Sequence, residues 1–178
     1  METPRDYLKK PTDILWTVLL TLLCILCFPV NPLILLDLLK TDYNQITYII
    51  GWITWTFGMV LVLSPIILFP RRGGVEKGKS FVHTTKLVDT GIYRIVRHPQ
   101  YLGGIFAIFI TTPLWYPHWL FVILGVFGIA VVYISCRAED QYLLEKFGDA
   151  YHIYMNKVPG INIVSGFIRA IRKGRQNE

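Results

Sequence analysis

The sequence predicts an all-α fold, a polytopic integral membrane helical bundle with four to five transmembrane helices. Composition is the first observation: the chain of 178 residues is 53% hydrophobic and 17% charged, with a mean hydropathy of +0.44. A soluble domain carries about 25% charged residues and lacks long apolar runs. The second observation is a series of apolar runs along the chain, and the third is the placement of basic residues around them.

Four apolar runs are candidates for membrane-crossing helices. A helix that spans a bilayer needs about 20 predominantly apolar residues. The first two runs have this length, and the last two are shorter. We expect the spans at about residues 14–39, 46–69, 99–114 and 118–137. The sequence P-V-N-P at 29–32 either kinks the first run or divides it into two segments, which would give a fifth span.

Basic residues are distributed asymmetrically around these runs. They precede the first run, fill the loop 71–98 and follow residue 136, and the only one elsewhere is Lys40. Because cytoplasmic flanks of membrane helices are enriched in Lys and Arg, we expect both termini and this loop in the cytoplasm. The short turn at 113–118 predicts that the last two spans form an antiparallel helical hairpin. The positions of these basic residues beside the predicted spans account for the net charge of +6, so no nucleic acid partner is expected.

Local signals mark the helix boundaries and contacts that we expect. Asp89, Thr90 and Gly91 are typical of a turn. Pro99 suits the first position of the third span, where its missing N–H costs nothing. Gly103 and the residue four positions later, Ala107, would allow a neighbouring helix to approach closely.

Residues 138–178 have the pattern of helices at a membrane interface. Apolar side chains recur at helical spacing over 143–155, with charged residues between them. The V-P-G sequence at 158–160 is expected to end this amphipathic helix. A last short helix around 167–173 is expected to rest on anionic headgroups, and a solvated basic tail is the alternative.

Polar residues form three clusters, at 87–103, 137–140 and 151–160. The predicted hairpin brings the first two clusters side by side. Glu139 lies near the end of an apolar run, where a carboxylate is costly unless it meets a cation or hydrogen-bond donors. A salt bridge to an arginine such as Arg97 is the structural alternative to a ligand site. The four His and three Cys residues lack metal-ligand spacing, so no metal is expected.

Two motifs resemble those of the isoprenylcysteine carboxyl methyltransferase family. The first is G-I-Y-R-I-V-R-H-P-Q-Y-L-G at 91–103, and the second is A-E-D-Q-Y-L-L-E-K-F-G-D-A-Y-H-I-Y-M-N-K-V-P at 138–159. The resemblance is to the short prokaryotic orthologs and covers residues 84–160, whereas residues 1–70 are similar only in being transmembrane. Phospholipid N-methyltransferases share a looser form of the pattern, and so do some sterol reductases.

This resemblance implies a single membrane-embedded methyltransferase domain over residues 1–178. It also implies that the cofactor is S-adenosyl-L-methionine and the product S-adenosyl-L-homocysteine. The residues expected to hold the cofactor are Leu87, Val88, Gly91, Tyr93, His98, Pro99, Tyr101, Leu102, Glu139 and Tyr151. The family motifs also map onto Thr90, Arg97, Phe147, Gly148 and Tyr154. A pair of glutamates in the family maps to Glu139 and Asp140, and the aspartate departs from the pattern.

Three residues are expected to have catalytic roles. Glu139 would bind the ammonium group of the cofactor, and Arg71 and Arg72 are candidates to orient an acceptor carboxylate. A carboxylate is already ionised at pH 7, so its methylation needs alignment rather than a base. An amine acceptor would instead need a base to remove its proton.

The resemblance implies a lipid-like or prenylated acceptor, reached from the surrounding membrane lipids. Gly51, Gly58 and Gly103 are expected to leave a gap between spans for its entry. We expect an integral membrane protein, in the plasma membrane if prokaryotic, with its active site facing the cytoplasm. The alternatives are a nicotinamide-dependent sterol or isoprenoid reductase and a non-enzymatic transporter or scaffold. The chain has no glycine-rich dinucleotide fingerprint, which a nicotinamide-dependent reductase would favour. Its predicted spans carry almost no ionisable residues near their middle, where transporters usually have them.

Overall fold

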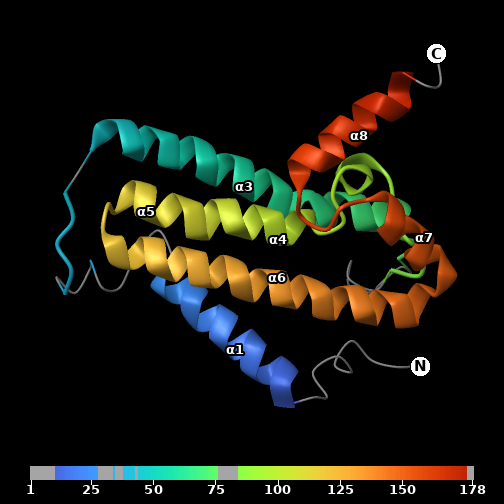
Figure 1. Ribbon diagram of the computed structural model, residues 1–178, viewed down its shortest axis with the longest axis horizontal. Helices are drawn as coiled ribbons and strands as arrows, with labels where there is room; N and C mark the ends of the chain where they lie inside the picture. Colours follow the sequence, from blue (N-terminus) through green and yellow to red (C-terminus); the bar gives the residue numbers. More distant parts are fainter. Residues whose placement is uncertain (1–10, 28–33, 35–37, 43, 76–83, 176–178) are drawn as a thin grey trace. The chain divides into compact units, whose positions relative to one another are not determined.

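The structure is a computed structural model that describes residues 11–27, 34, 38–42, 44–75 and 84–175. All regular secondary structure in these residues is helical (Figure 1), so the all-α prediction is confirmed for this part of the chain. The expected break at 29–32 and the basic residues before position 11 lie outside the described residues. The chain divides into two compact units, Met1–Val60 with Gly103–Arg137, and Leu61–Leu102 with Ala138–Glu178.

The helical elements follow one another with few long connections. In chain order they are α1 (Pro11–Leu26), α3 (Gln45–Arg72), the 3-10 turn η2 (Gly91–Arg94), α4 (Pro99–Gly104), the π-helical turn η3 (Ile105–Ile110), α5 (Thr111–Trp115), α6 (Trp119–Phe147), α7 (Asp149–Lys157) and α8 (Ile163–Arg175). Among the described helices, α3 and α6 are long and apolar enough to cross a membrane, judged by length and composition. The presence of four to five spans stays a prediction.

A polar side chain just before each of the two long helices, α3 and α6, accepts hydrogen bonds from N–H groups in the first turn of that helix. The Asn44 side-chain oxygen accepts hydrogen bonds from the N–H groups of Ile46 and Thr47, at 3.0 and 3.2 Å, before α3. Such a cap satisfies donors that have no partner within the helix. His118 has the same role before α6, where its Nδ1 accepts from the Leu120 N–H at 3.2 Å. Local polar residues therefore specify where both helices start.

The end of the fourth predicted span differs from the sequence-based expectation. We expected this span to end near residue 137, but α6 continues without a break to Phe147. The expected amphipathic interfacial helix therefore consists of the last turns of α6 followed by α7. The two are separated at Gly148, whose φ of 56° is a conformation that favours glycine. The last predicted helix is confirmed as α8, and the V-P-G sequence at 158–160 follows α7 as expected.

Glycines set the distance between helices in the first unit. A Cβ on Gly58 would lie 2.5 Å from the Ala107 nitrogen and 2.6 Å from the Gly103 oxygen. A Cβ on Gly51 would lie 2.5 Å from a ring carbon of Trp115. The predicted close approach at Gly103 and Ala107 is therefore confirmed. The expectation that Gly51, Gly58 and Gly103 leave a gap for a lipid-like acceptor is wrong, because neighbouring helices occupy that space.

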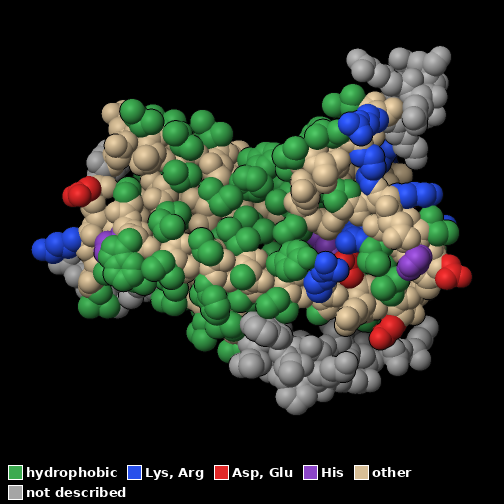
Figure 2. Space-filling model, viewed as in Figure 1, with side chains coloured by type: hydrophobic (Ala, Val, Ile, Leu, Met, Phe, Trp, Pro, Cys, Tyr) green, Lys and Arg blue, Asp and Glu red, His purple; other side chains and the backbone are tan. Residues whose placement is uncertain are grey.

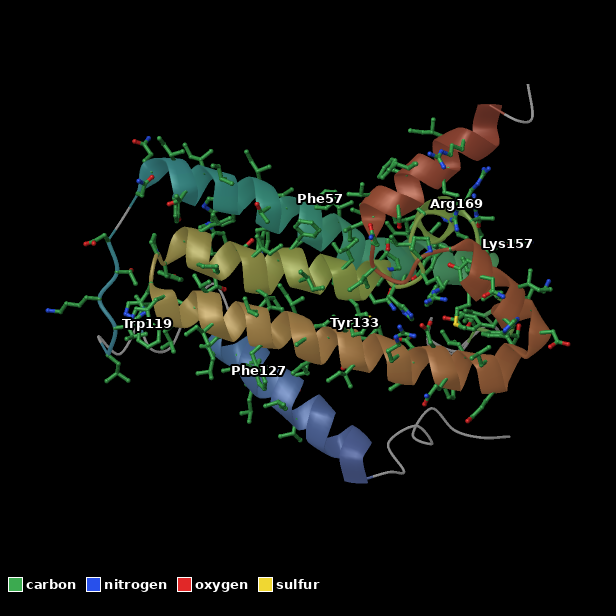
Figure 3. All side chains as sticks on the ribbon, viewed as in Figure 1. Phe57, Trp119, Phe127, Tyr133, Lys157 and Arg169 are labelled. Carbon is green, nitrogen blue, oxygen red and sulfur yellow. The ribbon has the colours of Figure 1, made fainter. Side chains whose placement is uncertain are left out.

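In the first unit the helix α6 packs against the segment that carries Gly103 and Ala107 (Figure 1). A Cβ on Gly125 would lie 2.7 Å from the Phe109 carbonyl oxygen of η3. The opposite faces of α3 and α6 are apolar and open: Ile53, Val126 and Phe127 are 65%, 65% and 49% exposed. Hydrophobic side chains cover these helices in Figure 2, and Phe127 is labelled on α6 in Figure 3. Exposed apolar surface of this extent is typical of contact with a membrane or another protein.

We predict that Gly58→Ala lowers the stability of the protein, because the added methyl group has no space between α3 and the helix that carries Ala107. Overpacking of this kind costs about 1–3 kcal/mol. Thermal unfolding of the detergent-purified protein can be followed with a thiol-reactive dye, since Cys27 and Cys136 are buried.

The matched control for this prediction is Gly104→Ala, because a Cβ on Gly104 meets no atom within 4 Å. This change should leave the melting temperature unchanged or raise it, since alanine stabilises a helix by about 0.5–1 kcal/mol relative to glycine. Equal melting temperatures for both variants would show that the helices do not pack as closely as the structure has them.

Candidate functional site

The polar residues singled out in the sequence come together in the second unit. They arise from the loop and turn before α4, from the C-terminal part of α6, and from α7 with the residues after it. Gly91 starts the turn η2 with a φ of 65°, which confirms the expected turn. Pro99 starts α4 as predicted, directly after Arg97 and His98.

The Asp140 carboxylate is the centre of this region. Its Oδ1 atom accepts hydrogen bonds from His98 Nε2 at 2.8 Å and from the Tyr151 hydroxyl at 2.6 Å. Its Oδ2 atom pairs with Arg97 Nη2 at 2.9 Å. Only 8% of the Asp140 side chain is exposed, and a buried charge is tolerated when donors of this kind surround it. We call these four residues the Asp140 cluster.

Backbone hydrogen bonds tie the same segment to the chain after α7. The Arg97 N–H donates to the Pro159 carbonyl at 2.9 Å, and the His98 N–H donates to the Gly160 carbonyl at 3.1 Å. Arg97 Nη1 also donates to the Met155 carbonyl at 3.2 Å. The Asp140 cluster therefore includes residues whose backbones are themselves fixed.

Two tyrosines of α7 connect this helix to the cluster and to η2. Tyr151 bonds to Asp140, and the Tyr154 hydroxyl donates to the Tyr93 carbonyl at 2.6 Å. Both side chains pack with Val158 in a buried apolar cluster that includes Leu87 at its edge. Burial raises the pKa of the Tyr151 phenol, and its hydrogen bond to Asp140 raises it further. The phenol therefore stays protonated at neutral pH and keeps donating to the carboxylate.

Glu139 has a different environment from its neighbour. Its side chain is 30% exposed, and its Oε2 atom lies 3.8 Å from His98 Nδ1. The Tyr101 hydroxyl is within hydrogen-bonding reach of the same carboxylate. Since Arg97 pairs with Asp140, the salt bridge to Arg97 that we considered for Glu139 is formed by the adjacent residue instead. Glu139 is thus a partly open carboxylate next to one whose donors are all internal.

The other predicted cofactor residues are distributed around this region. Val88, Tyr93 and Leu102 are buried, at 7%, 4% and 6% exposure, and Pro99 is buried as well. Gly91 is exposed. Their roles toward a cofactor stay predictions.

The two arginines predicted to act on the acceptor lie at the end of a long helix. Arg71 and Arg72 form the last turn of α3, and both side chains are exposed. Their role in orienting an acceptor carboxylate stays a prediction.

Asp140 has a larger structural role than its sequence context indicates. We placed less weight on it because it departs from the glutamate pair of the family motif. Its role depends on pairing with residues 42 and 43 positions earlier in the chain, which no local pattern reveals. The one available signal was a second acidic residue directly after Glu139, at a helix position that faces inward.

Comparisons with known proteins agree with the motif analysis. The sequence model of the phospholipid methyltransferase family matches residues 46–150, more than half of the chain. A methanethiol S-methyltransferase of Pseudomonas deceptionensis is 30% identical over 112 residues, which are 60% of this chain and 41% of that protein. The protein-S-isoprenylcysteine O-methyltransferase of Saccharomyces cerevisiae is 34% identical over 99 residues, 48% of this chain and 39% of that protein. The protein-S-isoprenylcysteine O-methyltransferase B of Arabidopsis thaliana is 28% identical over 121 residues, 61% and 58% of the two chains.

These matches leave part of each relative uncovered, since the aligned part is between 39% and 58% of the length of these three proteins. No solved structure matches the chain significantly. The family match begins in α3 and ends in α7. It therefore includes α3 and α6, the two helices of the described residues that are long enough to cross a membrane, together with Arg97, His98 and Asp140. The chain belongs to the phospholipid methyltransferase family, and isoprenylcysteine O-methyltransferases are among its relatives, as the two sequence motifs predicted.

Proposed function

We propose that this protein is a membrane methyltransferase that transfers a methyl group from S-adenosyl-L-methionine to an amphiphilic, lipid-like acceptor. The observation that carries this proposal is the pair Glu139 and Asp140, in which one carboxylate is internally satisfied and the other is partly open. Relatives that share this part of the chain are named as O- and S-methyltransferases. These comparisons do not favour the reductase or transporter alternatives.

The residues around Glu139 fit the chemistry of the proposed cofactor. Its amino acid end carries an ammonium group, for which a partly exposed carboxylate is a suitable partner. Val88, Tyr93 and Leu102 are apolar or aromatic and fit an adenine ring. When bound, the cofactor supplies an electrophilic methyl group on a sulfonium centre.

The Asp140 cluster would hold this site in position rather than contact the reacting atoms. Asp140 fixes the His98 ring through Nε2, and this leaves Nδ1 directed toward Glu139. Tyr151 and the residues after α7 are fastened to the same segment. A site that excludes water favours methyl transfer from a sulfonium to an anion, because opposite charges neutralise each other as the reaction proceeds.

The acceptor is proposed to be a carboxylate of the isoprenylcysteine type. Such a group is ionised at neutral pH and needs no general base. Arg71 or Arg72 would orient it, and their positive charges at the end of α3 favour a cytoplasmic location for this end. A thiol acceptor is the second candidate, because methanethiol S-methyltransferases are among the relatives. An alkyl thiol is almost entirely protonated at pH 7, since even the Cys side chain has a pKa of about 8.5.

We predict that the detergent-purified protein binds S-adenosyl-L-homocysteine and that Glu139→Gln weakens this binding at least about tenfold. The loss of one charged contact to the ligand ammonium corresponds to about 1.4 kcal/mol. Isothermal titration calorimetry gives the dissociation constants, with NADPH as a second ligand. Glu145→Gln is the matched control, because Glu145 is exposed on the same helix. Binding of NADPH but not of S-adenosyl-L-homocysteine would refute the proposed cofactor.

We predict that Asp140→Asn mainly lowers the stability of the protein, whereas Glu139→Gln mainly weakens ligand binding. Removing the charge leaves Arg97 buried without its ion pair, and breaking a buried pair costs about 3 kcal/mol or more. The melting temperature should fall clearly for this variant and stay close to wild type for Glu139→Gln. Asp149→Asn is the control, since Asp149 is exposed in the first turn of α7. A fully stable Asp140→Asn variant would contradict the structural role of the cluster.

We predict methyl transfer to a farnesylated cysteine derivative with a free carboxylate, measured with tritium-labelled S-adenosyl-L-methionine. The product should release labelled methanol in alkali, because methyl esters hydrolyse and thioethers do not. Arg71→Gln or Arg72→Gln should raise the KM for this acceptor by several-fold. Transfer to methanethiol alone, giving an alkali-stable product, would replace the carboxylate acceptor by a thiol, and no transfer to either would contradict both candidates.

A further inference from the structure

The C-terminal helix α8 has an apolar face that is open in the structure. Val164, Phe167, Ile168 and Ile171 are 65%, 49%, 48% and 62% exposed. Their spacing of three and four residues places them along one stripe of the helix. A four-residue apolar stripe of this kind is unfavourable in water and indicates contact with another surface.

The charged residues of α8 are all basic. The helix contains Arg169, Arg172, Lys173 and Arg175, and no acidic residue occurs between positions 163 and 175. Arg172 is exposed, and Ser165 is exposed on the polar side of the helix. Basic side chains, coloured blue, lie over α8 in Figure 2. Arg169 is labelled on this helix in Figure 3. A surface that is complementary to α8 must therefore be apolar and carry negative charge.

The structure fixes α8 next to the end of a long apolar helix. A Cβ on Gly166 would overlap the carbonyl oxygen of Ile95, so this face of α8 packs directly on the residue after η2. Arg169 Nη2 donates to the Arg94 carbonyl at 3.1 Å.

The turn η2 in turn contacts the last turns of α3. The rings of Tyr93 and Phe69 are 5.3 Å apart, and a Cβ on Gly91 would lie 3.5 Å from a Leu68 methyl carbon. The helix α3 ends at Arg72, three residues after Phe69, with Arg71 and Arg72 in its last turn. A membrane-crossing α3 would reach the headgroup layer at this point, so α8 is held at the height of lipid headgroups.

We propose that α8 lies on the surface of a membrane that contains anionic lipids, with its apolar stripe among the acyl chains and Arg172 against lipid phosphates. Amphipathic helices with a basic polar face bind membranes in this way. The proposal requires that α3 crosses the membrane, and it does not depend on the methyl transfer reaction. It assigns α8 as a lipid-binding surface separate from the residues around Glu139.

The test measures the depth of two positions of α8 in the full-length protein. Phe167 and Ser165 are replaced, one at a time, by p-acetylphenylalanine, which carries a ketone-reactive nitroxide and leaves the native cysteines unchanged. The protein is placed in nanodiscs of phosphatidylcholine alone or of an equal mixture with phosphatidylglycerol. Electron paramagnetic resonance power saturation then reports the access of oxygen, which dissolves in the acyl chains, and of a nickel chelate, which stays in water.

In the mixed nanodiscs the nitroxide at position 167 should be accessible to oxygen and protected from nickel, and the nitroxide at 165 should show the reverse. Arg172→Gln should increase nickel access at position 167 several-fold in these discs, whereas Arg172→Lys should not. Nickel access at 167 in the mixed discs would show that α8 lies in water. Exclusion of both reagents would show that protein covers the stripe.

Equal depth in the two kinds of nanodisc would exclude a role for anionic lipid. Each of these three outcomes overturns the proposal. Binding of S-adenosyl-L-homocysteine is measured in the same nanodiscs as an independent readout. Loss of that binding with unchanged nitroxide depth would count against the proposed enzyme function and leave the assignment of α8 intact.

Discussion

The buried carboxylate of Asp140 is the interaction on which the second unit depends. Such a group is costly unless donors replace the water it loses, and here the donors come from Arg97, His98 and Tyr151. The donors belong to the segment before α4 and to α7, and α7 also packs Tyr151 and Tyr154 against Leu143, Leu144 and Phe147 of α6. The same carboxylate therefore positions the turn before α4 and the helix α7. Removing it would leave a buried guanidinium and imidazole without their acceptor, a larger loss than that of one ordinary hydrogen bond.

The division between Glu139 and Asp140 follows from helix geometry. Adjacent residues of an α-helix point about 100° apart, so one carboxylate of the pair faces the protein and the other lies toward its edge. His98 lies between them, with Nε2 on Asp140 and Nδ1 at 3.8 Å from Glu139. The ring that stabilises the fold is thus also the nearest neighbour of the residue proposed to bind the ligand. In this arrangement one short motif contributes to stability and lies next to the residue proposed to bind the ligand.

The sequence predicted those features that depend on residues close together in the chain. The start of α4 at Pro99, the turn at Gly91 and the helix α8 each have a local signal, and each is confirmed. The features that the sequence did not predict depend on distant contacts. The helix α6 continues without a break to Phe147, and its last turns carry Asp140 and pack Leu143, Leu144 and Phe147 against Tyr151 and Tyr154 of α7. The glycines expected to leave a gap instead contact neighbouring helices, and periodicity cannot distinguish these two uses.

The turn η2 connects the proposed binding site to the proposed membrane-surface helix. The carbonyl of Tyr93 accepts from Tyr154 of α7, and the carbonyl of the next residue, Arg94, accepts from Arg169 of α8. These two carbonyls belong to successive peptide units that meet at the Arg94 Cα, so only the two backbone dihedrals of one residue separate them. The helices α7 and α8 are thus both bonded to this one turn, and α7 in addition carries Tyr151 to Asp140. One short turn therefore helps to position both the helix that completes the Asp140 cluster and the helix that we propose to lie on lipid.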